Sequence, residues 1–174
     1  MKEYKLLFTG ATGAGKTTAI RALSEGQLVC TDVPNSDASV DKALTTVGLD
    51  FGEVTLDNGD KLRLFGTPGQ LRFAFMWDIL SRGVMGVIIL IDYSAADPVG
   101  DLSAYLTHFR ERIRASACVV GIGRTDDIAN LSLDAFAEAA QRVGIVCPIV
   151  PVDVRVRTQV LVLIDLLLMQ LEHQ

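Results

Sequence analysis

The stretch GATGAGKT, residues 10–17, constrains the fold more than any other part of this 174-residue sequence. Residues 4–8 are expected to be a strand that enters this stretch, and residues 17–24 have the pattern of a helix. The stretch matches G-x-x-x-x-G-K-[ST] in full, between the strand and the helix that this pattern requires. Its glycines let backbone amides converge on phosphate oxygens, and the helix N-terminus adds partial positive charge. We expect a phosphate-binding loop, against the alternative of a plain glycine-rich turn.

The residues of this loop have distinct expected roles. Lys16 is expected to reach the β- and γ-phosphates, and the Thr17 hydroxyl is expected to ligate Mg²⁺. The expected nucleotide-binding residues of this region are Gly10, Ala11, Thr12, Gly13, Ala14, Gly15, Lys16, Thr17 and Thr18. Because nucleotide kinases, ATPases and GTPases all use such a loop, the class of protein has to come from other parts of the chain.

Strands and helices are expected to alternate along the rest of the chain. A DNG turn at residues 57–59 lies between two alternating runs, 49–56 and 61–65, and predicts a β-hairpin. Residues 84–91, VMGVIILI, are continuously apolar, which favours a central parallel strand covered on both faces. Residues 25–46 are polar and are expected to be irregular.

The second half of the chain continues the alternation. Its expected elements are a helix capped by Asp97 and apolar up to Ile113, a strand at 118–122, a helix after Ser132, a strand at 145–152 and a helix from about Arg155. This order predicts one α/β domain over residues 1–174. The expected architecture is a three-layer α/β/α sandwich whose six-stranded sheet is mostly parallel, with one antiparallel strand toward its edge.

Composition argues against several classes of protein. The hydrophobic fraction of 49% argues against disorder, and the net charge of −5 argues against a broad nucleic-acid-binding surface. Cys30, Cys118 and Cys147 lack metal-ligand spacing and are expected to be reduced. The sequence shows no signal-peptide pattern, lipidation motif or bilayer-spanning run. We expect a cytoplasmic protein, a monomer or weak dimer, with no stable membrane anchor and no nucleic-acid partner.

Two further stretches, TTVGLDFG from Thr45 and GTPGQ ending at Gln70, make nearly the whole sequence resemble Ras-like small GTPases. The pattern is most similar to the bacterial branch related to the MglA gliding-motility proteins. The resemblance implies a G-domain that binds GTP or GDP with Mg²⁺, hydrolyses GTP slowly and acts as a molecular switch. It also implies a GTPase-activating or regulatory partner of the roadblock type.

The resemblance assigns roles to residues of both stretches. A threonine before an apolar–Gly pair ligates Mg²⁺ in this family, which implies Thr46 as a metal ligand beside Thr17, with Thr45 as the alternative. Gly69 is implied to present its amide to the γ-phosphate, and Gln70 resembles the glutamine that orients the attacking water. The implied catalytic residues are Gln70, Lys16 and Gly69.

One departure from the family pattern concerns the metal. Gly66 stands where D-x-x-G has its aspartate, and Asp92, at the end of the neighbouring central strand, is a candidate replacement or a structural acid. The missing aspartate favours a rival interpretation, a nucleotide-binding scaffold with negligible hydrolysis.

The other departure concerns the base. The base-reading N-K-x-D appears here as GRTD, in which Gly123 replaces the asparagine. Asp126 is expected to accept hydrogen bonds from guanine N1 and N2, or else to be a plain turn or capping residue. Arg124 is expected to pack on the base, and the amide of Val154 to contact base O6. The incomplete motif favours a second rival, a P-loop ATPase or small-molecule kinase.

The sequence leaves the partner-binding residues open. The segment that follows GTPGQ corresponds to the second switch of the family that the sequence resembles. It is crowded with apolar side chains that fit an interface or the core equally well, namely Phe73, Phe75, Met76 and Trp77. The last helix carries a second apolar stripe, Val162, Leu166 and Met169, with the same two explanations. No arginine finger can be assigned, since Arg72 is expected to interact locally and Lys42 needs no special role. Arg110, Arg112 and Arg114 are expected on a solvated helix face.

Overall fold

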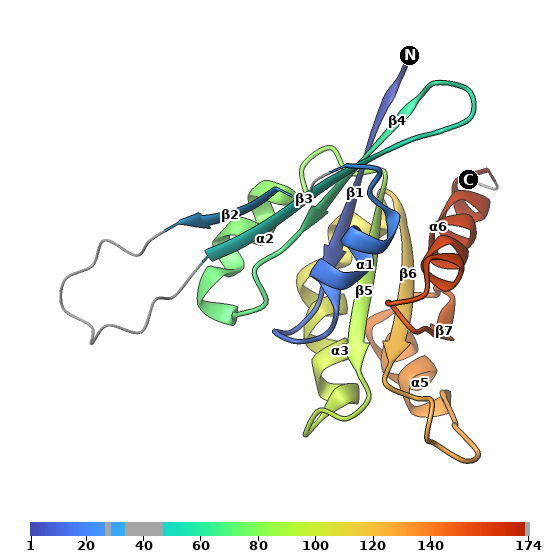
Figure 1. Cartoon of the computed structure of the whole chain (residues 1–174). Helices are drawn as coiled ribbons and strands as arrows, with labels where there is room; N and C mark the ends of the chain where they lie inside the picture. The colour runs from blue at the N-terminus through green and yellow to red at the C-terminus, as the bar shows by residue number, and fades with distance from the viewer. Residues whose placement is uncertain (27–28, 34–46, 173–174) are drawn as a thin grey trace.

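The structure, a computed structural model, describes residues 1–26, 29–33 and 47–172. In chain order, the main elements are β1 (Glu3–Thr9), α1 (Lys16–Leu23), β2 (Val29–Val33), β3 (Val47–Thr55), β4 (Lys61–Gly66), η1 (Leu71–Phe73), α2 (Ala74–Leu80), β5 (Gly86–Asp92), α3 (Pro98–His108), α4 (Arg110–Arg114), β6 (Ala117–Gly123), α5 (Asp134–Val143), β7 (Ile149–Pro151) and α6 (Arg157–Glu172). The strands form one sheet in the order β2-β3-β4-β1-β5-β6-β7, with helices on both faces (Figure 1). The predicted α/β sandwich is confirmed.

The direction of the strands also follows the prediction. β4, β1, β5, β6 and β7 are parallel neighbours, and β3 pairs antiparallel with β4. Beyond this six-stranded arrangement, residues 29–33 form β2 on the outer edge of β3, where the sequence predicts an irregular segment. A short strand of this kind depends on the backbone hydrogen bonds of its neighbour, so its local sequence alone does not identify it.

Different helices bury the two faces of the sheet. Leu6 and Phe8 of β1 belong to the cluster covered by α1 and α6. Leu7 belongs to the opposite cluster, with Trp77 of α2 and residues of α3, α4 and α5. Burial on both faces explains why the central strands are apolar at consecutive positions. Arg157 at the start of α6 donates to the last carbonyls of α1, at 2.9 and 2.6 Å, and so links the two helices of one layer.

Two predicted elements differ in extent. The helix after Asp97 divides at Phe109 into α3 and α4. Asp97 caps α3 as predicted, since its side chain accepts a hydrogen bond from the Gly100 amide at 2.9 Å. The last strand is shorter than predicted, because the Ile145 amide still bonds to the end of α5, behind the left-handed Gly144.

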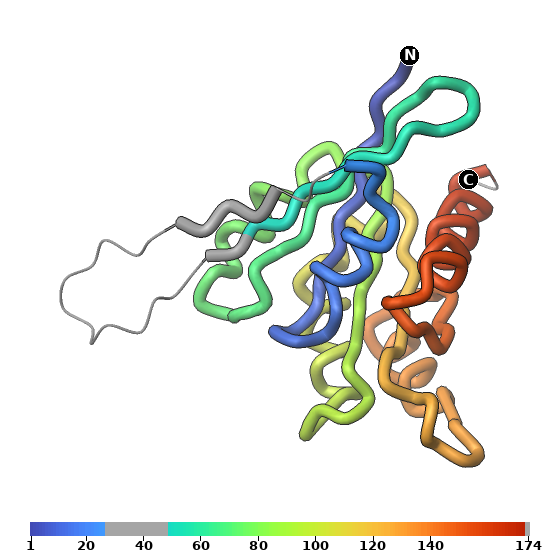
Figure 2. The backbone as a smooth tube through the Cα atoms, viewed as in Figure 1, coloured from blue at the N-terminus to red at the C-terminus, as the bar shows by residue number. Residues whose placement is uncertain are grey.

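The carboxyl ends of β1, β5 and β6 meet at one edge of the sheet. Figure 2 shows the loops after these strands at this edge, while the N-terminus lies at the other end beside the β3–β4 hairpin. The Lys2 amide donates to Asp60 Oδ1 of that hairpin at 2.7 Å. Within the described part of the chain, none of the helices combines the length and the apolar composition needed to cross a bilayer. The loops at the carboxyl edge are where ligands bind in open parallel sheets.

Candidate functional site: two cavities beside the phosphate loop

The loop between β1 and α1 has a backbone that only glycine fits at two positions. Gly10 has φ 145°, and a Cβ there would lie 2.2 Å from the carbonyl oxygen of Leu90. Gly15 has φ 99°, and a Cβ there would lie 2.7 Å from a methyl carbon of Val154. The loop is therefore packed tightly against the ends of the neighbouring strands. This close packing lets the loop amides face a ligand at the start of α1.

The Lys16 side chain folds back over the loop. Its Nζ donates to the carbonyl oxygens of Gly10 at 2.6 Å and Ala11 at 2.8 Å, and the residue is 8% exposed. Burial lowers the pKa of Lys16 to about 8, an effect that the carboxylate of Asp50 opposes. A largely buried ammonium beside backbone amides favours an anion such as a phosphate chain.

A buried carboxylate faces this lysine and the start of α1. Asp50 of β3 is 7% exposed, and its Oδ2 accepts a hydrogen bond from the Thr17 hydroxyl. In the hairpin register Asp50 lies opposite Gly66, where a Cβ would be 3.1 Å from the Asp50 Cβ. The carboxylate that D-x-x-G has at position 66 therefore comes from the neighbouring strand, and Gly66 leaves room for it.

Sequence reasoning missed Asp50 and suggested Asp92. The Asp92 carboxylate instead accepts hydrogen bonds from the Ser94 amide and hydroxyl, and it lies 3.3 Å from Arg124 Nη1. A signal for Asp50 exists in the alternation of the hairpin, because Asp50 shares the buried face of β3 with Val54. A carboxylate on the core side of a strand needs a polar partner, and Thr17 provides it.

A cavity of about 200 Å³ lies between the phosphate loop and the turn after β4. Its lining residues are Thr12, Gly13, Lys16, Thr17, Asp50, Thr67, Pro68, Gly69, Gln70 and Phe73. The predicted residues Lys16, Thr17, Gly69 and Gln70 are thus brought together. Gly69 packs directly on the loop, because a Cβ there would lie 2.4 Å from the Thr12 nitrogen. Thr45 and Thr46 lie outside the described residues.

Aromatic side chains hold the turn in this place. The indole Nε1 of Trp77 donates to the Pro68 carbonyl oxygen at 2.7 Å, and the Tyr105 hydroxyl donates to that of Gly69 at 3.4 Å. The two rings lie 5.0 Å apart. Burial raises the pKa of Tyr105 to about 12, so its hydroxyl stays a donor at neutral pH. Residues of α2 and α3 therefore set the position of the turn relative to the phosphate loop.

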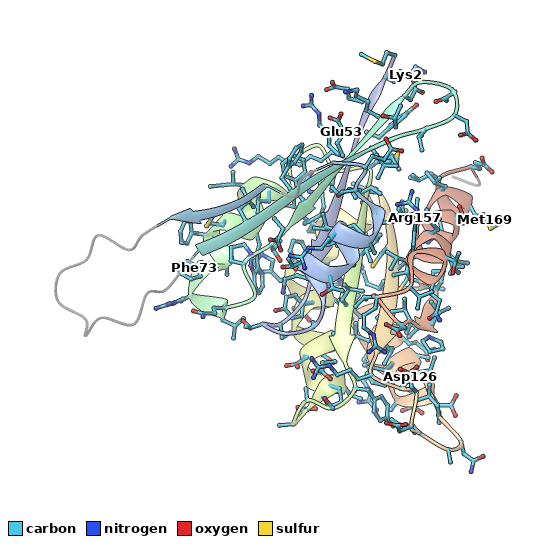
Figure 3. All side chains as sticks on the ribbon, viewed as in Figure 1. Lys2, Glu53, Phe73, Asp126, Arg157 and Met169 are labelled. Carbon is cyan, nitrogen blue, oxygen red and sulfur yellow. The ribbon has the colours of Figure 1, made fainter. Side chains whose placement is uncertain are left out.

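A second cavity, of about 470 Å³, lies on the other side of the loop. Its lining residues are Gly13, Ala14, Gly15, Thr18, Asp92, Gly123, Arg124, Asp126, Asp127, Val152, Asp153, Val154 and Arg155. The three residues predicted to contact the base, Arg124, Asp126 and Val154, line this cavity together with Gly123 and the phosphate loop. Arg124 joins the two parts, since its Nη2 donates to the Gly13 carbonyl oxygen at 3.2 Å. Figure 3 shows Asp126 at the same edge of the sheet.

Sequence reasoning gave no role to Arg155, which borders this cavity. Its guanidinium donates to Asp153 at 2.7 and 2.8 Å and lies 3.6 Å from Asp126 Oδ2. These hydrogen bonds lower the pKa of Asp153 to about 2. Arg155 therefore fixes one carboxylate beside the cavity and approaches the one predicted to read the base.

The apolar residues of the second switch divide between core and surface. Trp77 is 2% exposed, whereas Leu71, Phe75 and Ile79 are 71%, 62% and 56% exposed. Phe73 and Met76 are partly buried. Because these three exposed residues follow one another at intervals of four positions, they lie on one side of η1 and α2. The sequence pattern alone does not separate these two groups.

The remaining predicted surface residues lie away from both cavities. Arg72 lies over the Phe73 ring at 4.8 Å, the local interaction that was expected, and Lys42 is outside the described residues. Met169 points away from the sheet (Figure 3), and Val162 is also exposed, while Leu166 packs against the core. The arginines of α4 line neither cavity.

Comparison with known proteins gives two kinds of match. A model for a family described as "Conserved hypothetical ATP binding protein" matches residues 28–141, which include the 123–126 loop but not the phosphate loop. Several curated relatives are named as Ras-related or GTP-binding proteins. Ras-related protein RABD1 of Arabidopsis thaliana is 26% identical over 128 residues, which cover 72% of this chain and 57% of that protein.

Two other relatives give the same level of similarity. GTP-binding protein ypt4 of Schizosaccharomyces pombe is 26% identical over 144 residues, 79% of this chain and 57% of that protein. Ras-related protein Rab-3 of Caenorhabditis elegans is 26% identical over 148 residues, 82% of this chain and 63% of that protein. The chain spans less than two thirds of the length of these relatives. The similarities support a place in the P-loop GTPase superfamily.

Proposed function

The chain belongs to the family described as conserved hypothetical ATP binding proteins, and we propose that it is a small guanine-nucleotide switch that binds GTP and GDP. The observation that carries this proposal is the convergence of Lys16, Thr17, Asp50 and Gln70 on one cavity. That cavity and the larger one share Gly13, so a nucleotide tail and its base can occupy both sides of one loop. The name of one relative, GTP-binding protein ypt4, supports guanine as the base.

The residues at the start of α1 fit a magnesium ion. Mg²⁺ prefers oxygen ligands and keeps several waters, so one hydroxyl and one nearby carboxylate suffice as its protein partners beside a phosphate chain. Thr17 would hold the ion directly, Asp50 would hold it directly or through water, and Thr46 is proposed as a further ligand. When bound, the ion would neutralise charge on the β- and γ-phosphates.

The chain's own residues suit slow hydrolysis. Lys16 would stabilise charge on the transferred phosphoryl group, and Gln70 would orient the attacking water. Gly69, now packed on the loop, would turn its amide to a third phosphate, and the turn would move when that phosphate leaves. None of the described residues that line this cavity is an arginine. We therefore propose that a partner accelerates the reaction, with a roadblock-type regulator and the bacterial MglA-related branch as the specific hypothesis.

Nucleotide titration tests this function. Trp77 is the single tryptophan of the chain and is bonded to the turn, so its fluorescence should report a third phosphate. We expect GTP and GDP to bind in a Mg²⁺-dependent way, ATP to compete poorly, and a GTP analogue to change the emission differently from GDP. Lys16→Ala is the control that should bind neither nucleotide.

Four outcomes would contradict the proposal or one part of it. Binding of ATP at least as tight as that of GTP would favour an ATPase, which the family description and the bare Gly123 also support; phosphate transfer to an acceptor would favour a kinase. Tight GTP binding that never releases phosphate, even with a regulator, would identify a scaffold. Fast single-turnover hydrolysis by the isolated chain would refute the need for a partner.

A further inference from the structure

The turn after β4 is held through the carbonyl groups of two consecutive peptide units. The indole Nε1 of Trp77 donates to the Pro68 carbonyl oxygen at 2.7 Å. The Tyr105 hydroxyl donates to the Gly69 carbonyl oxygen at 3.4 Å. Within the described part of the chain, neither the Gly69 amide nor the Gln70 amide donates a hydrogen bond. The turn is therefore bound through its acceptors, and two of its donors are left for a ligand.

The planarity of the peptide unit determines where the Gly69 amide points. In a trans peptide unit the N–H and the C=O point in opposite directions, and the described residues contain no cis peptide bond. Because the Pro68 carbonyl points to Trp77, the Gly69 amide of the same unit points away from α2. The cavity of about 200 Å³ lies on that other side, because Lys16 and Thr17 line it at the start of α1, which covers the opposite face of the sheet. The Gly69 amide therefore faces the side of the phosphate loop.

Trp77 is fixed in this position by its own packing. The residue is 2% exposed. Its ring centroid lies 5.0, 5.1 and 5.9 Å from those of Tyr105, His108 and Phe109. A buried N–H that loses its acceptor is costly, so the indole keeps the Pro68 carbonyl on its side and resists a flip of this peptide unit. A small shift of the turn, without such a flip, is then enough to bring the Gly69 amide to a third phosphate.

We propose that Trp77 is a positioning residue for the third phosphate: its indole N–H aims the Gly69 amide and so sets how strongly the protein prefers a nucleoside triphosphate to a diphosphate. This inference rests on the proposed nucleotide-binding function and assigns that function a further residue. Backbone amides that face one concave site bind anions. A diphosphate lacks the group that the Gly69 amide would contact, so Trp77 acts on the binding of the triphosphate alone.

A tryptophan analogue tests the role of the N–H by itself. Trp77 is the single tryptophan of the chain, so benzothienylalanine, in which sulfur replaces the indole N–H, can be incorporated at this position alone with little change in shape. Calorimetry with Mg²⁺ measures the affinities for GDP and for a non-hydrolysable GTP analogue. We expect the affinity for the GTP analogue to fall about 3- to 10-fold, the effect of one neutral hydrogen bond. The affinity for GDP should not change.

Two tyrosine variants provide a matched comparison. Tyr105→Phe removes the hydroxyl that holds the next peptide unit, and it should lower the affinity for the GTP analogue by a smaller factor, because its hydrogen bond is longer. Tyr4→Phe also removes one hydroxyl, but Tyr4 packs against the cluster on the other face of the sheet. This control should change the affinity for neither nucleotide.

Two results would overturn the role given to Trp77 and leave the proposed function in place. One is an unchanged affinity of the benzothienylalanine protein for the GTP analogue. The other is an equal loss of affinity for GDP and for the GTP analogue, which would indicate a purely structural role. A wild-type chain that binds neither nucleotide would instead overturn the proposed function, and this inference with it.

Discussion

Replacing Asp50 by alanine is the most informative change at the candidate site. In the structure the buried Asp50 carboxylate accepts a hydrogen bond from the Thr17 hydroxyl. Its negative charge also lies close enough to Lys16 to oppose part of the lowering of the Lys16 pKa by burial. If Thr17 and Asp50 hold Mg²⁺, the loss of the Asp50 carboxylate should weaken the binding of Mg²⁺ more than the binding of the nucleotide. Loss of a partner that supports a metal ligand costs about 10- to 100-fold in metal affinity. A charge-assisted hydrogen bond is worth about 1.5–3 kcal/mol, which corresponds to a similar factor.

The assay follows nucleotide dissociation as a function of free Mg²⁺. Fluorescent GDP is released from the wild-type chain and from Asp50→Ala, and the Mg²⁺ concentration that halves the release rate is compared. Working near pH 6.5 keeps Lys16 protonated in the wild type, where its pKa is about 8, and leaves a margin for the lower pKa of Lys16 that we expect without Asp50. We expect the Mg²⁺ midpoint to rise by about 10- to 100-fold, while GDP affinity in EDTA changes little.

Two further variants make this test specific. Glu53→Ala also removes an acidic side chain from β3, but Glu53 pairs with Lys61 outside both cavities and should leave the midpoint unchanged. The exchange Asp50→Gly with Gly66→Asp returns the carboxylate to the same face from the opposite strand and should recover most of the loss. A midpoint for Asp50→Ala within threefold of the wild type would refute the role given to Asp50.

Three other changes test separate parts of the site. GTP affinity should be constant below about pH 7 and fall by up to about tenfold per pH unit above pH 8, because burial holds the pKa of Lys16 in the nucleotide-free protein at about 8 and only the protonated lysine attracts phosphate. Calorimetry across this pH range measures the affinity, and an affinity that does not change with pH would contradict the prediction. Gly123→Asn should raise the preference for GTP over ATP by up to about tenfold, because a Cβ at this position has no atom closer than 3.7 Å and the side-chain amide can add a hydrogen bond to the base. An unchanged ratio of GTP to ATP affinity in competition assays would contradict this prediction. Trp77→Phe should lower the free energy of unfolding by about 2–4 kcal/mol, because it removes the buried hydrogen-bond donor to Pro68 and leaves a cavity in the core. Urea denaturation measures this free energy, and a loss below about 1 kcal/mol, the value of one hydrogen bond, would show that other contacts hold the turn.

The sequence predicted most of the fold because most of its signals are local. The run 84–91 is apolar at every position but Gly86, and it contains most of β5, a central strand buried on both faces. Asp97 predicted the start of α3 through a contact only three residues away. β2 and the break at Phe109 were not predicted, because a strand partner and the packing of α3 and α4 decide them.

The candidate site likewise has some features that local sequence predicts and others that depend on contacts between distant residues. The sequence alone predicted the phosphate loop and the position of the 123–126 loop, because each is a contiguous motif that follows a strand. Only the tertiary structure decided that Asp50, rather than Asp92, faces Thr17, and that Trp77 is buried while Phe75 is exposed. Strand register and helix packing join residues that are distant in the chain, and no spacing within one segment encodes which of them meet.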